Sequence, residues 1–246
     1  MVNWGSQLGF FGKFMGFNVP VKFPTVTNVT LDVDANRTIG YIIMGTDFQP
    51  FVSDRYPLLG GPLEYTVDYT ARDRAVGSSE DSIPRSYLDA VIEAGGLTNI
   101  TYGSPRTVLS SLEDPSGAVF GRLYRPLLRG RYSFKDGNLL EITVRVTSTM
   151  RVFIRCRSPV GRRPVQFFRR FQLVPNPFAP NLFTLDGSAL GFFRGAQRVC
   201  PRFDIRENPL VPERNGAFIF SATRDTLFVV LGDFIKGIKP LILTRT

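Results

Sequence analysis

The sequence predicts a mainly β protein, an antiparallel β sandwich or barrel (a jelly-roll-like order included) with one main amphipathic helix. Three features support this class. Several short segments alternate apolar and polar residues, 18 Pro and 23 Gly punctuate the chain, and one segment alone has a clear helical period. Of the 246 residues, 43% are hydrophobic and 21% charged, the composition of a folded protein. Because short strands and turns dominate, we expect an antiparallel fold rather than alternating strands and helices.

The first third of the chain has the period of half-buried strands. Residues 26–34, VTNVTLDVD, alternate apolar and polar side chains, and residues 38–44 continue the pattern. Residues 62–70, PLEYTVDYT, alternate in the same way. The polar positions include several carboxylates, so we expect strands with an acidic outer face.

One helix is expected over residues 83–94. Ser82 is a suitable N-cap, Pro84 stands in the first turn, and Gly95 with Gly96 can end the helix. Its apolar stripe consists of Tyr87, Leu88, Val91 and Ile92. We expect this stripe to pack across a sheet or to cover an open end.

Positive charge is concentrated in residues 122–170, which hold 13 Lys and Arg against 2 Asp and Glu. Residues 1–121 hold 8 basic against 13 acidic residues, and residues 171–246 hold 9 against 6. A block of this density predicts an anion-binding surface. Arginine outnumbers lysine 25 to 5, which suits bidentate contacts with phosphate or carboxylate.

The basic block is predicted to form a β meander. Residues 131–135 and 139–146 flank Asp136-Gly137, a dipeptide typical of a tight hairpin. In the strand that follows, Met150, Val152, Ile154 and Cys156 share one face. The opposite face then carries three arginines and one ring. The predicted anion- or partner-binding residues are Arg151, Phe153, Arg155, Arg157, Arg162, Arg163, Arg169 and Arg170.

Three regions are predicted along the chain. Residues 1–22 form an apolar N-terminal arm, and residues 23–173 form a β-rich main domain that contains the basic block. Residues 174–246 begin with the Pro-rich joint VPNPFAPN and continue with strands that we expect to pack on the same domain.

The N-terminal arm carries phenylalanines at spacings that suit one side of a helix: Phe10, Phe11, Phe14 and Phe17. An apolar arm that docks on its parent domain or on a neighbouring subunit is favoured, because an exposed apolar surface promotes aggregation. The alternative, membrane-surface contact, is less favoured because the segment has one lysine and several glycines.

Missing residue types exclude several chemistries. The chain has no histidine, so Ser-His-Asp triads and histidine-based zinc sites are ruled out. We predict no catalytic residues, no metal site and no cofactor. With only Cys156 and Cys200 and no secretory signal, two reduced, buried thiols are favoured, and a single disulfide is the alternative.

The segment CRSPVGR, from Cys156 to Arg162, resembles the phosphate-binding loop of cysteine-dependent phosphatases. That resemblance implies a cysteine nucleophile and an arginine that holds the phosphate oxygens. Arg155 stands where the family has histidine, Arg163 where it has a hydroxyl residue, and a strand-like pattern follows Pro164. A non-catalytic basic turn is therefore favoured.

Two function classes remain. The favoured one is a non-enzymatic structural or assembly subunit of a large particle, such as a minor capsid or tail protein of a virus or phage, which contacts other protein subunits through the arm and the basic surface. The alternative is an RNA- or DNA-binding protein, or a ribonucleoprotein component, that uses residues 122–170. The longest apolar runs are too short to span a bilayer as a helix. We expect localisation in a virion or a cytoplasmic assembly, without secretion by a signal peptide.

Overall fold

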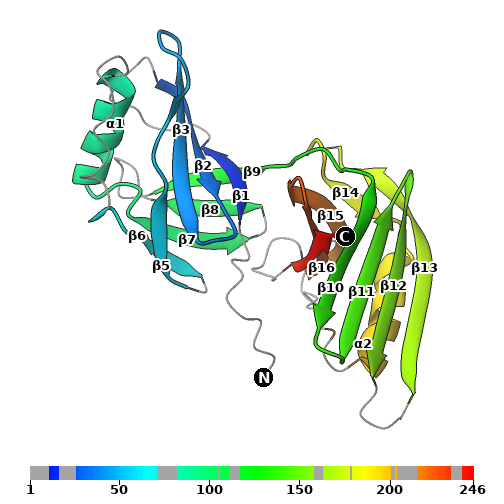
Figure 1. Cartoon of the computed structure of the whole chain (residues 1–246). Helices are drawn as coiled ribbons and strands as arrows, with labels where there is room; N and C mark the ends of the chain where they lie inside the picture. The colour runs from blue at the N-terminus through cyan, green and yellow to red at the C-terminus, as the bar shows by residue number, and fades with distance from the viewer. Residues whose placement is uncertain are drawn as a thin grey trace. The chain divides into compact units, whose positions relative to one another are not determined.

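The computed structural model describes residues 11–16, 26–61, 63–70, 82–104, 106–110, 117–157, 163–177, 179–200, 203, 215–233 and 240–246. The chain folds into two compact units, residues 4–123 and residues 124–246. Each unit contains a closed antiparallel barrel of eight strands (Figure 1). The predicted class is therefore confirmed in its barrel form, although two barrels are present.

The first barrel is built by β1 (Gly12–Gly16), β2 (Val26–Val33), β3 (Thr38–Gly45), β5 (Tyr56–Gly60), β6 (Glu64–Val67), β7 (Asn99–Ser104), β8 (Thr107–Ser110) and β9 (Ala118–Leu123), with β4 (Phe51–Val52) paired to β3. The strand order is β2-β1-β9-β8-β7-β6-β5-β3, and pairing of β3 with β2 closes the barrel. The predicted alternation in β2 is confirmed, since Val29, Leu31 and Val33 are buried.

The predicted helix is α1 (Ser82–Glu93), which lies between β6 and β7 in the sequence. Tyr87, Leu88 and Val91 of its stripe are buried. Gly95 has a positive φ of 82°, and the amide of Gly96 donates to the carbonyl of Val91 at 2.7 Å. These are features of a Schellman end, which glycine accommodates without steric cost.

The described part of the N-terminal segment is a strand rather than a helical arm. β1 lies between β2 and β9, where Phe14 is fully buried and Phe11 is 2% exposed. Phe14 points inward from β1 by strand alternation, whereas Phe11 is buried just before the strand begins, so their spacing does not reflect a helical period. Phe11 and Phe14 thus belong to the core of the parent barrel, whereas Phe10 and Phe17 lie outside the described residues.

The second barrel contains β10 (Gly130–Asp136), β11 (Leu140–Val146), β12 (Thr149–Arg157), β13 (Pro164–Pro175), β14 (Phe183–Leu185), β15 (Asn215–Thr223), β16 (Thr226–Asp233) and β17 (Leu241–Arg245). Each strand pairs with its successor, and β10 with β17 closes the barrel. The predicted hairpin between β10 and β11 is confirmed, but its loop is longer than the predicted dipeptide turn: Asp136 pairs with Leu140, and the loop of residues 137–139 begins with Gly137, whose φ is 51°.

A second helix, α2 (Ala189–Val199), was not predicted. Ala189, Phe193 and Ala196 belong to the same buried cluster as Val152 and Ile154 of β12. The helix therefore packs against the inward side chains of this wall, and it lies behind β10–β13 in Figure 1. The ring of Phe193 stacks on those of Phe171 and Phe203, with centroids 5.8 Å apart in both pairs.

Cys156 and Cys200 form a disulfide, so the prediction of two reduced thiols is wrong and the alternative holds. Cys156 points inward from β12, and Cys200 follows the last residue of α2. Both are almost fully buried. The packing of α2 on the inner wall brings together two residues that are 44 positions apart.

The division of the chain differs from the predicted one. The boundary falls between Leu123 and Tyr124, and the Pro-rich segment lies inside the second barrel, where Pro175 of β13 pairs with Phe183 of β14. A proline at the end of a strand requires no break between domains. As expected, the C-terminal strands pack with the basic strands. Of the two helices in the described part of the chain, neither is long and apolar enough to cross a membrane.

Candidate functional site

The predicted faces of β12 are confirmed. Met150, Val152, Ile154 and Cys156 point into the barrel and are at most 3% exposed. Arg151, Arg155 and Arg157 are exposed on the other face, and Phe153 is half-buried among them. Strict alternation along the strand separates a dry inner face from a charged outer one.

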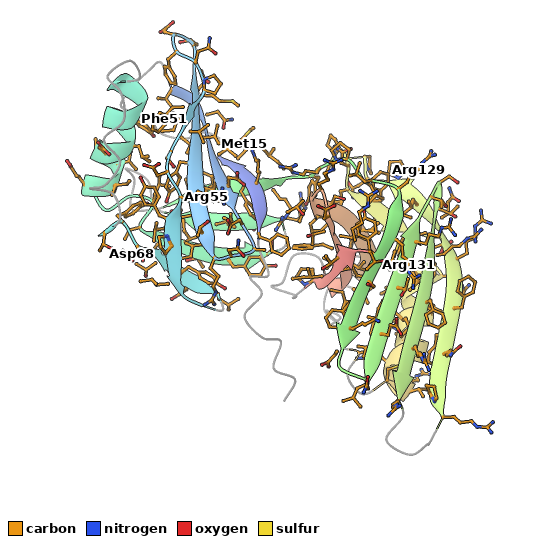
Figure 2. The ribbon with its side chains drawn as sticks, viewed as in Figure 1. Met15, Phe51, Arg55, Asp68, Arg129 and Arg131 are labelled. Carbon is orange, nitrogen blue, oxygen red and sulfur yellow. A yellow bond between two sulfur atoms is a disulfide. The ribbon has the colours of Figure 1, made fainter. Side chains whose placement is uncertain are left out.

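The strand register extends this face across β10, β11, β12 and β13. Arg131 stands opposite Arg145, Arg145 opposite Arg151, and Arg151 opposite Arg170. We call these four exposed residues the arginine ladder, and the outward side of β10–β13 the basic face. Neighbouring strands lie about 4.8 Å apart, so the ladder extends over roughly 14 Å. Figure 2 shows the side chains that project from these strands, with Arg131 labelled.

The arginine ladder lacks compensating carboxylates. Within the described residues, none of its four members forms an ion pair with Asp or Glu. Arg170, a member of the ladder, donates a hydrogen bond from Nε to Oγ1 of Thr149 at 3.1 Å. Like charges directly opposite each other on neighbouring strands destabilise a sheet. The fold thus carries an unfavourable charge arrangement that a bound anion would relieve.

Other residues of the basic face form parallel rows beside the ladder. Next to it stand Ser133, Thr143, Phe153 and Phe168, and then Lys135, Glu141, Arg155 and Gln166. Phe168 is 65% exposed. Glu141 stands between Lys135 and Arg155 and forms an ion pair with Lys135 at 3.6 Å, so this row carries two cations and one carboxylate.

A cavity of about 190 Å³ lies at one end of the basic face. Lys135, Arg155 and Arg157 line it together with Glu141 and Asn138. Because cations outnumber carboxylates around this cavity, it continues the anion-attracting character of the face.

The structure brings together some of the predicted site residues and separates others. Arg163 is exposed just before β13, and Arg162 lies outside the described residues. Arg169 stands opposite the inward-facing Val152, so it belongs to the other side of β13 from Arg170. Its guanidinium carbon lies 5.9 Å from the ring centroid of Phe171. Arg169 therefore does not extend the basic face.

Arg131 and Arg145 were missed as site residues. The predicted two-residue turn at Asp136-Gly137 would place residue 131 opposite residue 142, whereas the observed loop is centred on Asn138 and places Arg131 opposite Arg145. The next turn, at Thr147-Ser148, places Arg151 opposite Arg145 by the same symmetry. The alignment therefore depends on the length of the first loop, which was not predicted from the sequence.

The phosphatase-like reaction has no support at Cys156. Its sulfur is bonded to Cys200, whereas a cysteine nucleophile has to be a free thiolate. The described residues contain no group of Cys, Asp and Glu side chains arranged to hold a metal ion.

Comparison of the chain with family models, with curated proteins and with solved structures gives no match.

Proposed function

We propose that the protein is a non-enzymatic nucleic-acid-binding subunit of a larger assembly, and that the basic face contacts phosphate groups. One observation carries this proposal: the register that aligns Arg131, Arg145, Arg151 and Arg170 without a carboxylate between them. Guanidinium groups form planar, bidentate contacts with phosphate oxygens. A row of them matches a polyanion better than it matches a single small ligand.

Charge distribution supports the same proposal. Residues 124–246 hold 21 Lys and Arg against 8 Asp and Glu, whereas residues 4–123 hold 9 against 13. The positive field therefore belongs to one barrel, where it would steer a polyanion towards the basic face.

A salt titration of binding tests the proposal. Binding of a fluorescently labelled oligonucleotide is measured by anisotropy for the wild type and for an Arg145→Gln, Arg151→Gln, Arg170→Gln variant. The matched control is Arg125→Gln, Arg198→Gln, Arg224→Gln, which removes three exposed charges of the same unit that lie outside strands β10–β13. Each lost phosphate contact lowers the slope of log affinity against log salt by about 0.7–0.9.

We expect a slope smaller by about 2–3 in the ladder variant and a smaller change in the control. Equal binding by the two variants at every salt concentration would show that the basic face is an ordinary solvated surface. Circular dichroism checks that both variants keep the β fold.

A second candidate is the structural particle subunit, which contacts protein rather than nucleic acid. Two observations favour it. The Cys156–Cys200 disulfide is of a kind that persists outside a reducing cytosol, virion surfaces included. In addition, Leu109 of β8 and Val119 of β9 stand opposite each other and are 41% and 50% exposed. In this case Leu109→Lys would disrupt particle assembly, and unchanged assembly would contradict this candidate.

A further inference from the structure

Two phenylalanine rings lie within the basic face. Phe168 of β13 is 65% exposed and stands directly opposite Phe153 of β12, which is half-buried. Phe168 contributes little to the barrel core, since most of its side chain is exposed, whereas Phe171 of the same strand points inward and is 1% exposed. The two rings together form a small apolar surface bordered by arginines, and apolar surface rimmed by polar residues marks sites of interaction.

Each ring has a cation nearby on its own strand. Arg151 and Arg155 are two residues before and after Phe153, and Arg170 is two residues after Phe168. Two residues along a strand correspond to about 7 Å on the same face. A row of rings therefore runs beside the arginine ladder, parallel to it and within reach of its guanidinium groups.

We infer that the basic face binds single-stranded nucleic acid, with bases stacked on Phe168 and Phe153 and phosphates bound along the arginine ladder. This inference rests on the proposed function and names its ligand. A base of a single strand presents its flat surface to an aromatic side chain, and such stacking tolerates any sequence. In a duplex the base surfaces are covered by neighbouring bases, so a duplex would engage only the arginines.

The test compares three probes of equal length: a single-stranded oligonucleotide, the corresponding duplex, and a single strand with abasic sites, which keeps the phosphates but lacks the bases. Binding is measured for the wild type, Phe168→Leu and Phe153→Leu, with Val174→Ala as control on an exposed apolar residue of the same strand. Leucine retains an apolar side chain and removes the aromatic surface. Because Phe168 is largely exposed, Phe168→Leu leaves the core intact.

We expect Phe168→Leu to lower the affinity for the single strand about 5- to 100-fold and to leave duplex and abasic binding unchanged. The slope against salt should stay as in the wild type, since no phosphate contact is lost. Equal affinity of the wild type for single strand and duplex, or wild-type affinity of Phe168→Leu for the single strand, would overturn the inference but not the proposed function. Failure of the wild type to bind any of the three probes would overturn both.

Discussion

On the first barrel Lys13 of β1 stands opposite Asp32 of β2, whereas on the second barrel Arg145 of β11 stands opposite Arg151 of β12. The first barrel surrounds Asp32 with cations: Lys13 lies 3.8 Å away and Arg55 lies 3.5 Å away. Arg55 also pairs with Asp34 at 3.3 Å. Opposite charges across strands stabilise a sheet, and like charges destabilise it.

The same closed eight-stranded architecture therefore carries two different surfaces. Inward side chains determine whether a barrel forms, and both barrels bury a full set of apolar residues. The outward side chains do not form these cores, and their charges are paired around Asp32 on the first barrel but alike along the arginine ladder on the second. Three predictions test this contrast through the stability of each barrel, measured by hydrogen exchange resolved to peptides from residues 4–123 and from residues 124–246.

The largest expected effect concerns the disulfide, which is confined to the second barrel. Replacement of Cys156 and Cys200 by Ala should lower the free energy of unfolding of this barrel by about 2–4 kcal/mol, because the cross-link restrains the unfolded chain. Exchange in the first barrel should not change. A reducing agent should reproduce the effect in the wild type and have none in the variant; equal protection of the second barrel before and after reduction would contradict the prediction.

The next effect is an alkaline loss of stability that we expect to be greater in the first barrel. Burial raises the pKa of Tyr41 well above its ordinary value, with a further contribution from Tyr69, and burial also raises the pKa of Tyr102. A raised pKa in the folded state means that stability is complete below the ordinary tyrosine pKa of about 10 and is lost as the pH rises through the folded value. The second barrel has Tyr132 with a raised pKa, also caused by burial.

Tyr41→Phe should therefore reduce the alkaline loss in the first barrel. At neutral pH the same variant should lose about 1 kcal/mol, because the hydroxyl oxygens of Tyr41 and Tyr69 are hydrogen-bonded at 2.6 Å. Measuring the stability of the first barrel at neutral pH and at about pH 11 separates the loss of the hydrogen bond from the effect of tyrosine ionisation. A parallel loss in wild type and variant would show that ionisation of Tyr41 is not involved.

The smallest expected effect is the change in stability when one outward charge is removed, and it has opposite signs in the two barrels. Arg151→Thr should stabilise the second barrel by about 0.2–1 kcal/mol in the absence of ligand, because it removes repulsion from Arg145 and Arg170. Asp32→Asn should destabilise the first barrel by up to about 1 kcal/mol through loss of its ion pairs. High salt should reduce both effects. Destabilisation by Arg151→Thr would mean that the ladder contributes to folding itself.

Local patterns in the sequence predicted the elements that depend on neighbouring residues. The alternation in β2 and β12, the Asp136-Gly137 hairpin and the helix ended by Gly95 all follow from side-chain period or from turn geometry. These features require no knowledge of distant parts of the chain.

Features that depend on distant contacts were not predicted. β1 belongs to the first barrel because it pairs with β9, which lies more than 100 residues later in the sequence. The helix α2 contains Gly191, Gly195 and two adjacent phenylalanines, which weaken its local helix signal, and it is stabilised by packing on the barrel wall. The disulfide depends on that packing, and the arginine ladder depends on registers across four strands.

The disulfide also determines how the second barrel responds to mechanical tension. β12 presents Arg151 and Arg155 outward and Cys156 inward, so the strand that would contact a bound polymer is covalently tied to the end of α2. Sheet strands pulled from a surface ordinarily separate by rupture of hydrogen bonds one after another. Here a pull on β12 would also act on α2, because Cys156 and Cys200 are covalently joined and one side of the helix packs in the buried cluster. A load on the outer face of β12 would therefore be transmitted through the disulfide to residues of the buried cluster.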